Sequence, residues 1–304
     1  MRIDLETALR KKAINGWRLF FLISLPISAA VIIEMLRTDL SGGEGISSMI
    51  GYSVRFAIPF IFLALGASSA YAMFPHPVTA WLARNRRYIG LCFATAMFWQ
   101  AVFIFTMTVF FRGFYFDDVY YFRDELEGSV GYVFLVGMVL TSFAFTRKGL
   151  SPQQWKYIHK GGVYFLWAYA FSVYWWNLYY YPEPETIDYI FYWMGFTAFA
   201  LRIAAWGKKR SRKSNGASTP ATLKFLGTIL IGLGLTASAT GLLWQKTLTD
   251  FMTSPAWSAE LELWLPFWPL EPFLSLLIIA LGTLIFTYTT AQSDGAIDRH
   301  SLSH

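Results

Sequence analysis

The sequence is poor in charged residues, cysteine and histidine, and each shortage excludes a class of protein. Only 14% of its 304 residues are charged, whereas soluble domains average about 25%. The single cysteine, Cys92, excludes an intrachain disulfide and a cysteine-based zinc or iron–sulfur centre. No glycine-rich phosphate loop precedes a predicted helix, so the chain lacks the motif of a nucleotide-binding domain.

Apolar residues, by contrast, are abundant: 55% of the chain is hydrophobic and 19% is aromatic. A soluble fold of this length could not bury so much apolar surface, so the sequence predicts an all-α integral membrane protein. About twenty apolar residues cross a bilayer. Eight such segments are present: Trp17–Leu36, Val54–Phe74, Tyr88–Phe111, Val130–Phe145, Gly161–Tyr181, Ile187–Trp206, Phe225–Trp244 and Pro272–Tyr288.

The charges of the connecting loops alternate in sign along the chain. Basic residues occupy the N-terminal segment and the loops after the second, fourth and sixth segments, whereas the loops after the third, fifth and seventh are acidic. The positive-inside rule places the basic loops and both termini in the cytoplasm, which indicates a bacterial inner-membrane protein. The net charge of +6 therefore reflects membrane topology, and we expect no nucleic-acid partner. The densest basic run, Lys208–Lys213, is a topology signal or a contact to anionic lipid.

The last two apolar segments are predicted to form a separate unit. A small, polar linker, Ser214–Thr219, divides a six-helix core, residues 1–213, from a two-helix appendix, residues 214–304. The seventh segment has small residues at spacings that allow close helix approach: Gly227, Gly232, Gly234, Ala237 and Gly241. The loop that follows has the composition of an interfacial aromatic belt, with Trp257, Trp264 and Trp268.

Three stretches of the core resemble a known membrane family. They are RRYIGLCFATAMFWQ (residues 86–100), VLTS (139–142) and WKYIHKGGVYFLWAYAFS (155–172). Together they are similar to the ferric-reductase-like transmembrane family, which includes NADPH oxidases, metalloreductases and the haem-binding membrane subunit of bacterial methionine-sulfoxide reductase. The resemblance covers roughly residues 54–206. It implies a six-helix core that holds haem b between histidines of two helices.

Two of the positions that the resemblance assigns to haem ligands hold other residues. Gln100 stands at the position of the ligand in the third segment, and Ser172 stands at that of the second ligand in the fifth. Each lies about twelve residues from the start of its segment, so both are expected near mid-membrane. An amide and a hydroxyl are not usual axial ligands of haem iron. We expect them instead to satisfy each other by a hydrogen bond.

His159 alone keeps its place in the family motif. His76 lies between two prolines in a predicted loop, and His300 and His304 lie in the polar tail. Arg86 and Arg87 are expected at the membrane depth of His159. The resemblance then implies a haem with His159 as its single iron ligand and an arginine at a propionate. The alternatives are a lipid phosphate or a quinone headgroup at the same place.

Other polar residues in the spans are weaker candidates. Asn177 and Arg202 lie within predicted spans, where polar groups are functional candidates, although Arg202 is close enough to the end of its segment to snorkel. The aromatic run of the fifth segment, from Tyr164 to Trp176, lines a cofactor cleft or packs the core.

The sequence leaves three alternative hypotheses for the function of the protein. The first is electron transfer by a b-type cytochrome-like subunit that works with a separate redox partner protein. Such a subunit has no flavin or nicotinamide domain of its own, so whether it is an enzyme stays open. The second is a haem-free scaffold, assembly or regulatory protein on the same fold. The third is a small-molecule transporter, for which the sequence shows no inverted repeat and no carboxylate at the span centres.

Overall fold

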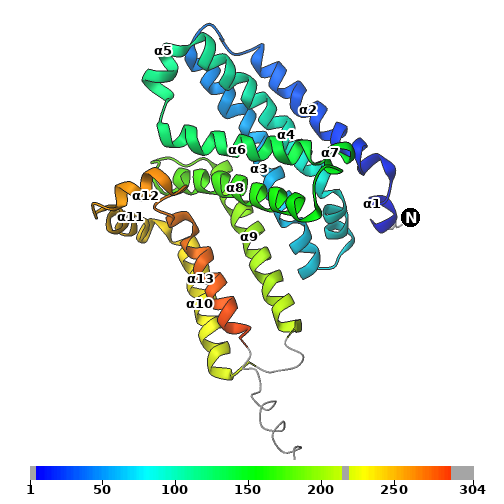
Figure 1. Cartoon of the computed structure of the whole chain (residues 1–304), viewed down its shortest axis with the longest axis vertical. Helices are drawn as coiled ribbons and strands as arrows, with labels where there is room; N and C mark the ends of the chain where they lie inside the picture. The colour runs from blue at the N-terminus through cyan, green and yellow to red at the C-terminus, as the bar shows by residue number, and fades with distance from the viewer. Residues whose placement is uncertain (1–4, 214–218, 289–304) are drawn as a thin grey trace, which may run out of the picture.

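A computed structural model describes residues 5–213 and 219–288, and within these ranges the chain is helical with no strand (Figure 1). The fold class is therefore confirmed as all-helical. The α-helices are α1 (Leu5–Leu9), α2 (Trp17–Met35), α3 (Gly43–Met73), α4 (Pro77–Phe110), α5 (Arg112–Phe114), α6 (Phe122–Leu140), α7 (Ala144–Arg147), α8 (Pro152–Tyr179), α9 (Thr186–Lys213), α10 (Ala221–Ala239), α11 (Gln245–Thr253), α12 (Ser258–Trp264) and α13 (Glu271–Phe286).

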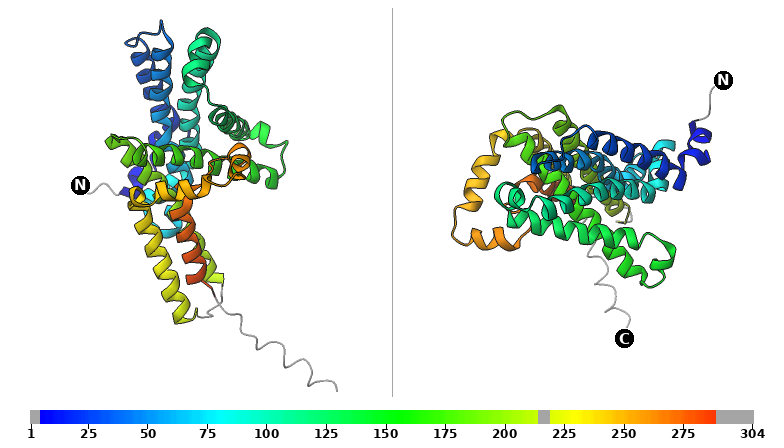
Figure 2. Two further views of the ribbon diagram at one scale, coloured as in Figure 1. Left: turned by 90° about the vertical axis from the view of Figure 1, so that its left-hand side faces the viewer. Right: turned by 90° about the horizontal axis from the view of Figure 1, so that it is seen from above.

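The long helices form two bundles joined by a crossing pair. Figure 1 and the left view of Figure 2 show α2, α3 and α4 together at one end of the long axis, and α9, α10 and α13 toward the other. Helices α6 and α8 lie between the bundles and cross them at a large angle. The second half of α3 packs along α9, where a Cβ on Gly66 would lie 3.5 Å from Ala198. The two bundles therefore meet where α3 packs against α9.

Each of the eight apolar segments coincides with one long helix. Four helices are long and apolar enough to cross a membrane by length and composition, namely α2, α3, α4 and α10. Helix α13 is apolar but shorter. The bilayer environment is thus supported by these helices, whereas the full set of eight crossings stays a prediction.

The fourth segment ends five residues earlier than predicted. Helix α6 ends at Leu140: the backbone N–H of Thr141 makes its last bond of the α-helical kind, to Gly137 O, and the chain then turns into α7. The seventh segment also ends earlier than predicted, since α10 stops at Ala239. The chain that follows is largely helical. It folds into a 3₁₀ turn followed by α11 and α12.

Aromatic side chains of α8 form the centre of the core. Phe171 and Trp175 are fully buried. The Phe171 ring lies 5.4 Å from Tyr192 of α9, and the Trp167 ring lies 4.2 Å from Phe199. The packing interpretation of this aromatic run is therefore confirmed for these residues, and α8 is fixed firmly against α9.

The helices α10 and α13 approach closely through glycine. A Cβ on Gly227 would lie 2.7 Å from the carbonyl oxygen of Gly282, and one on Gly234 would lie 2.7 Å from that of Ser275. The predicted close approach is confirmed at these two positions. It is wrong at Gly232, which faces open space.

A buried ion pair joins this hairpin to the core. Glu127 of α6 accepts hydrogen bonds from the backbone N–H of Phe267 at 2.8 Å and from Arg123 Nε at 3.2 Å. Arg123 also donates to the carbonyl oxygen of Trp268. The C-terminal helices are therefore anchored to α6. Most of the predicted linker, 214–219, lies outside the described residues, so the domain boundary stays a prediction.

Candidate functional site

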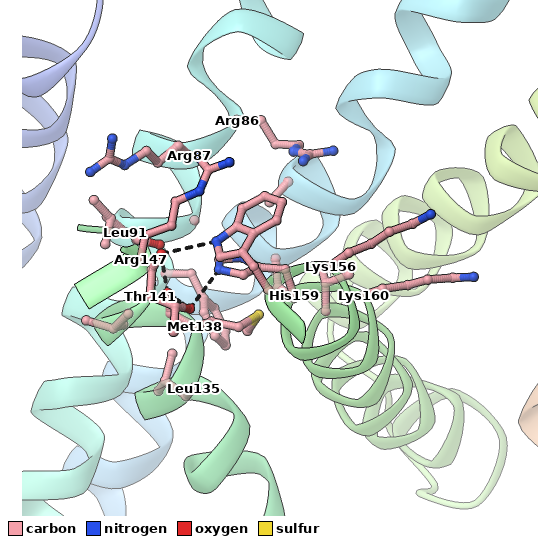
Figure 3. A pocket seen from close by; sticks show the side chains of 18 of the residues that line it. Arg86, Arg87, Leu91, Leu135, Met138, Thr141, Arg147, Lys156, His159 and Lys160 are labelled. Carbon is pink, nitrogen blue, oxygen red and sulfur yellow. Dashed lines mark hydrogen bonds between the residues drawn. The ribbon is translucent and has the colours of Figure 1, made fainter. Parts of the chain in front are cut away.

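A basic pocket opens where α3, α4, α6, α7, α8 and α9 meet. Its volume is about 530 Å³, and Figure 3 shows it from close by. Buried apolar side chains line the inside, including Ile61, Phe93 and Leu135. Six cationic side chains line the rest: Arg86, Arg87, Arg147, Lys156, Lys160 and Arg202. The pocket thus combines a cationic mouth with an apolar interior.

No carboxylate lines this pocket. In the described part of the chain the ion pairs involve other cations, and none of the six lies within 4.0 Å of a carboxylate. Neutral groups hold two of them in place. Arg86 donates to Ser68 Oγ at 2.9 Å, while Arg202 donates to Tyr164 Oη at 3.0 Å and to Leu65 O at 3.1 Å. The positive charge of the pocket is therefore left without a neighbouring counter-charge.

The start of α8 presents three of the polar groups on adjacent turns. Ser151 caps the helix, its hydroxyl accepting from Gln154 N at 3.2 Å while the Gln154 side chain accepts from Ser151 N at 2.9 Å. Pro152 occupies the first helical position, where no backbone N–H is needed. This capping box fixes the first turn. Residues 156, 159 and 160 then fall on the same face because neighbours three and four apart adjoin on a helix.

Trp155 fastens the beginning of α8 to the end of α6. Its indole N–H donates to the carbonyl oxygen of Thr141 at 3.1 Å, which satisfies one of the free carbonyls at that helix end. The Arg147 guanidinium lies 4.7 Å from the Trp155 ring centre on one side, and the His159 ring lies 4.3 Å away. Arg147 and His159 are therefore held by the same aromatic ring.

The imidazole of His159 has a defined partner within the pocket. Its Nε2 lies 2.9 Å from Thr141 Oγ1, as the dashed lines of Figure 3 show. The Thr141 hydroxyl has one proton, which it donates to Gly137 O at 2.6 Å. Its oxygen must then accept from His159, and the bonding network assigns the proton to Nε2. The same nitrogen cannot also offer a lone pair to a metal.

His159 is also held in its neutral form. It precedes the apolar stretch that begins at Gly161. Burial, followed by the nearby charges of Arg86 and Arg147, lowers the pKa of His159 from 6.5 to about 4. Removing a cation from water and placing it beside two others both disfavour protonation. An anion bound in the pocket would reverse the second of these effects.

The structure brings together three of the five residues singled out from the sequence. His159, Arg86 and Arg87 all line the basic pocket. Gln100 and Ser172 lie elsewhere. The Gln100 Oε1 accepts from Tyr132 Oη of α6 at 2.9 Å, and Ser172 Oγ donates to Tyr169 O within its own helix at 2.9 Å. Each polar group therefore has its own partner, and the hydrogen bond expected between them is not formed.

The described residues do not fit a haem held by His159. The Nε2 position is a donor to Thr141, and the two mid-helix positions hold an amide and a hydroxyl that are already bonded. Among the residues that the structure describes, no group of three or more His, Cys, Asp or Glu side chains could hold a metal ion. The site is better suited to an anion than to a metal.

Sequence reasoning did not group four of the pocket cations with His159. Arg147, Lys156 and Lys160 belong to a basic loop that serves as a topology signal. Arg202 is a functional candidate within its span, close enough to the span's end to snorkel. The alternation of basic and acidic loops was the sequence signal that could have indicated this cluster. Loops on the same side of a membrane can lie next to one another, so their cations can line one pocket. The sequence contained no sign of Thr141 as the partner of His159, since the contact depends on how α6 and α8 cross.

Within the described residues, fold and site define a helical protein with four helices apolar and long enough to cross a membrane and with a basic pocket that has an apolar interior. Comparisons with protein-family models, with curated proteins and with solved structures found no match.

Proposed function

We propose that this chain is a membrane protein whose basic pocket binds the anionic head of an amphipathic molecule. The observation that supports the proposal is the set of six Lys and Arg side chains around a cavity whose inner wall is apolar and which no carboxylate lines. Guanidinium and ammonium groups form strong charge-assisted bonds with phosphate and carboxylate oxygens. The apolar interior would accept the hydrocarbon part of the same molecule.

This proposal corresponds to the haem-free alternative on a ferric-reductase-like fold. Binding, rather than electron transfer, is the role that the side chains are equipped for. A regulatory or assembly role would follow if occupancy of the pocket changed how α6, α7 and α8 pack. Arg147 and His159 stack on one indole, so a ligand that drew Arg147 away would alter this packing.

The topology proposed with this function has eight crossings and cytoplasmic termini in a bacterial inner membrane. Its support is the alternation of basic and acidic loops and the coincidence of each apolar segment with a helix. Helices α6 and α8 lie at a large angle to the other long helices (Figure 2). Whether these two helices cross the membrane is therefore the point of the topology that most needs a test. Reporter fusions after residues 150 and 183 test this point. The proposal requires a cytoplasmic reporter signal at 150 and an external one at 183.

Binding can be tested with phosphatidylglycerol as the probe. The detergent-purified protein is titrated with this lipid and, separately, with phosphatidylcholine, while intrinsic fluorescence is followed. We expect tighter binding of the anionic lipid. Replacing both Arg147→Gln and Lys156→Gln should weaken it at least about tenfold, because a hydrogen bond to a charged group contributes roughly 1.5–3 kcal/mol.

A matched control separates the pocket from general surface charge. Lys209 is exposed on α9 and does not line the pocket. Lys209→Gln should leave the affinity unchanged, apart from a small effect of net charge that disappears at high salt. Equal losses in the pocket and control variants would reject the pocket as the binding site.

Electron transfer with a separate redox partner is the second candidate. The observation in its favour is the position of His159 beside Arg86 and Arg87 in one pocket, as the family resemblance implies. Its test is an absorption spectrum of purified protein, oxidised and then reduced with dithionite, after expression with haem precursor. A Soret band at near-stoichiometric haem that His159→Ala abolishes would establish this candidate. A colourless, folded protein would reject it.

A further inference from the structure

A second cavity lies at the end of the C-terminal hairpin that is nearer to α6 and α8. Helices α11 and α12 follow directly after α10 and precede α13, so they cover one end of that pair (Figure 1). The cavity is a groove of about 460 Å³ between α11 and the hairpin. Its lining is Ala237, Trp244, Thr247, Leu248, Phe251 and Leu274. Five of these six side chains are apolar.

Helix α11 is amphipathic. Leu248 and Phe251 face the groove, whereas Lys246 and Asp250 form an exposed ion pair at 3.4 Å. Residues 248 and 251 are three apart, as are neighbours on one helix face, and residues 246 and 250 are four apart on another. A short helix of this kind is typical of one that lies in a membrane interface with its apolar side toward the lipid.

Large apolar side chains are exposed on the same segment. Leu243 is 81% exposed, and Phe251 and Trp264 are each 74% exposed. Burying one such side chain away from water stabilises a protein by roughly 1.5–3 kcal/mol, and this free energy is lost when the side chain stays in water. Tryptophan and other aromatic residues are enriched at the membrane surface, where one end of the ring can stay wet. The segment therefore has the surface of an interfacial element.

The groove continues the lipid-facing surface of the hairpin. Helix α10 is apolar and long enough to cross a bilayer, and Leu233 and Leu235 are exposed on it. The groove begins at Ala237, only two residues further along the same helix. The end of a crossing helix lies at headgroup depth, so the groove opens at the upper part of the acyl-chain layer.

We propose that this groove binds a lipid acyl chain while α11 and α12 lie in the membrane interface. Phe251 and Leu248 contact the chain, and the Lys246–Asp250 pair faces the headgroups and water. This inference is independent of the basic pocket. It depends on the apolar groove and on its continuity with the exposed face of α10.

Spin labels can test the proposal because the chain has one cysteine. Cys92→Ser provides a thiol-free background. Phe251→Cys and Lys246→Cys are each labelled with a nitroxide and reconstituted into vesicles of phosphatidylcholine and phosphatidylglycerol. Collision rates are then measured with oxygen, which partitions into lipid, and with a water-soluble nickel chelate. We expect an oxygen-to-nickel ratio several times higher at 251 than at 246.

Two results would overturn the proposal. Equal access of the nickel chelate to both labels would place α11 in water. Shielding of the 251 label from both reagents would mean that protein, here a second copy of the chain, covers the groove. Thr247→Cys, which lines the groove, and Asp250→Cys repeat the comparison if one of the first variants fails to fold.

Discussion

His159 Nε2 and Thr141 Oγ1 lie 2.9 Å apart and join the end of α6 to the second turn of α8. The intervening residues include α7, which carries Arg147 into the pocket. The contact therefore sets the tautomer of the imidazole. It also joins the α6 and α8 sides of the basic pocket.

Removing the Thr141 hydroxyl should destabilise the protein. Thr141→Val keeps the shape but leaves the His159 Nε2–H without an acceptor in a partly buried place. The expected loss is about 1–3 kcal/mol, the usual cost of an unsatisfied buried donor, measured by thermal unfolding in detergent. Thr106→Val is the control, since the Thr106 hydroxyl is exposed and bonds only Val102 O of its own helix. An equal loss in both variants would contradict the role of the contact.

The stability of the protein should depend on pH through His159. Its pKa in the folded protein, about 4, lies below the 6.5 of the unfolded chain. Between these values the unfolded chain binds the additional proton, so the free energy of unfolding should fall as the pH falls from about 6.5 to 4. His159→Gln, which does not titrate, should show a flatter profile. A wild-type curve no steeper than that of the variant would refute the prediction.

Adding one methyl group between α10 and α13 should separate them. Gly227→Ala would place its Cβ 2.7 Å from backbone atoms of Gly282 and Phe286, which cannot move aside independently. Overpacking of this kind costs roughly 1–3 kcal/mol. At Gly232, which faces open space, the same substitution should instead stabilise the helix by about 0.5–1 kcal/mol. Thermal unfolding of both variants tests the opposite signs.

A buried and an exposed ion pair, Arg123–Glu127 within α6 and Arg55–Glu185, should differ in strength. The Glu127 side chain is 11% exposed and also binds the backbone of Phe267, so Glu127→Gln should cost about 2 kcal/mol or more. It should also speed proteolysis of the α12–α13 connection. The Arg55–Glu185 pair is more than half exposed, and Glu185→Gln should cost less than about 1 kcal/mol. Similar losses would show that the anchoring of the hairpin does not depend on Glu127.

The helical class and the approximate positions of the long helices could be predicted from the amino-acid sequence. Long apolar runs leave the backbone no partner in lipid except itself, so helices follow from composition alone. The sequence also identified His159, Arg86 and Arg87, because local motifs and loop charges are written in order along the chain. The glycines at 227 and 234 were likewise predictable from their spacing.

How the helices cross, and which groups their polar side chains contact, could not be predicted before the helices were seen packed together. Gln100 and Ser172 have similar depth by residue counting, yet Gln100 bonds Tyr132 of α6 and Ser172 bonds Tyr169 O within α8. The crossing of α6 and α8 places Thr141 against His159. Six cations from four helices, α4, α7, α8 and α9, surround one cavity. Contacts between segments depend on packing angles, which apolar periodicity does not encode. The pocket is therefore a property of the fold, although each of its charges is visible in the sequence.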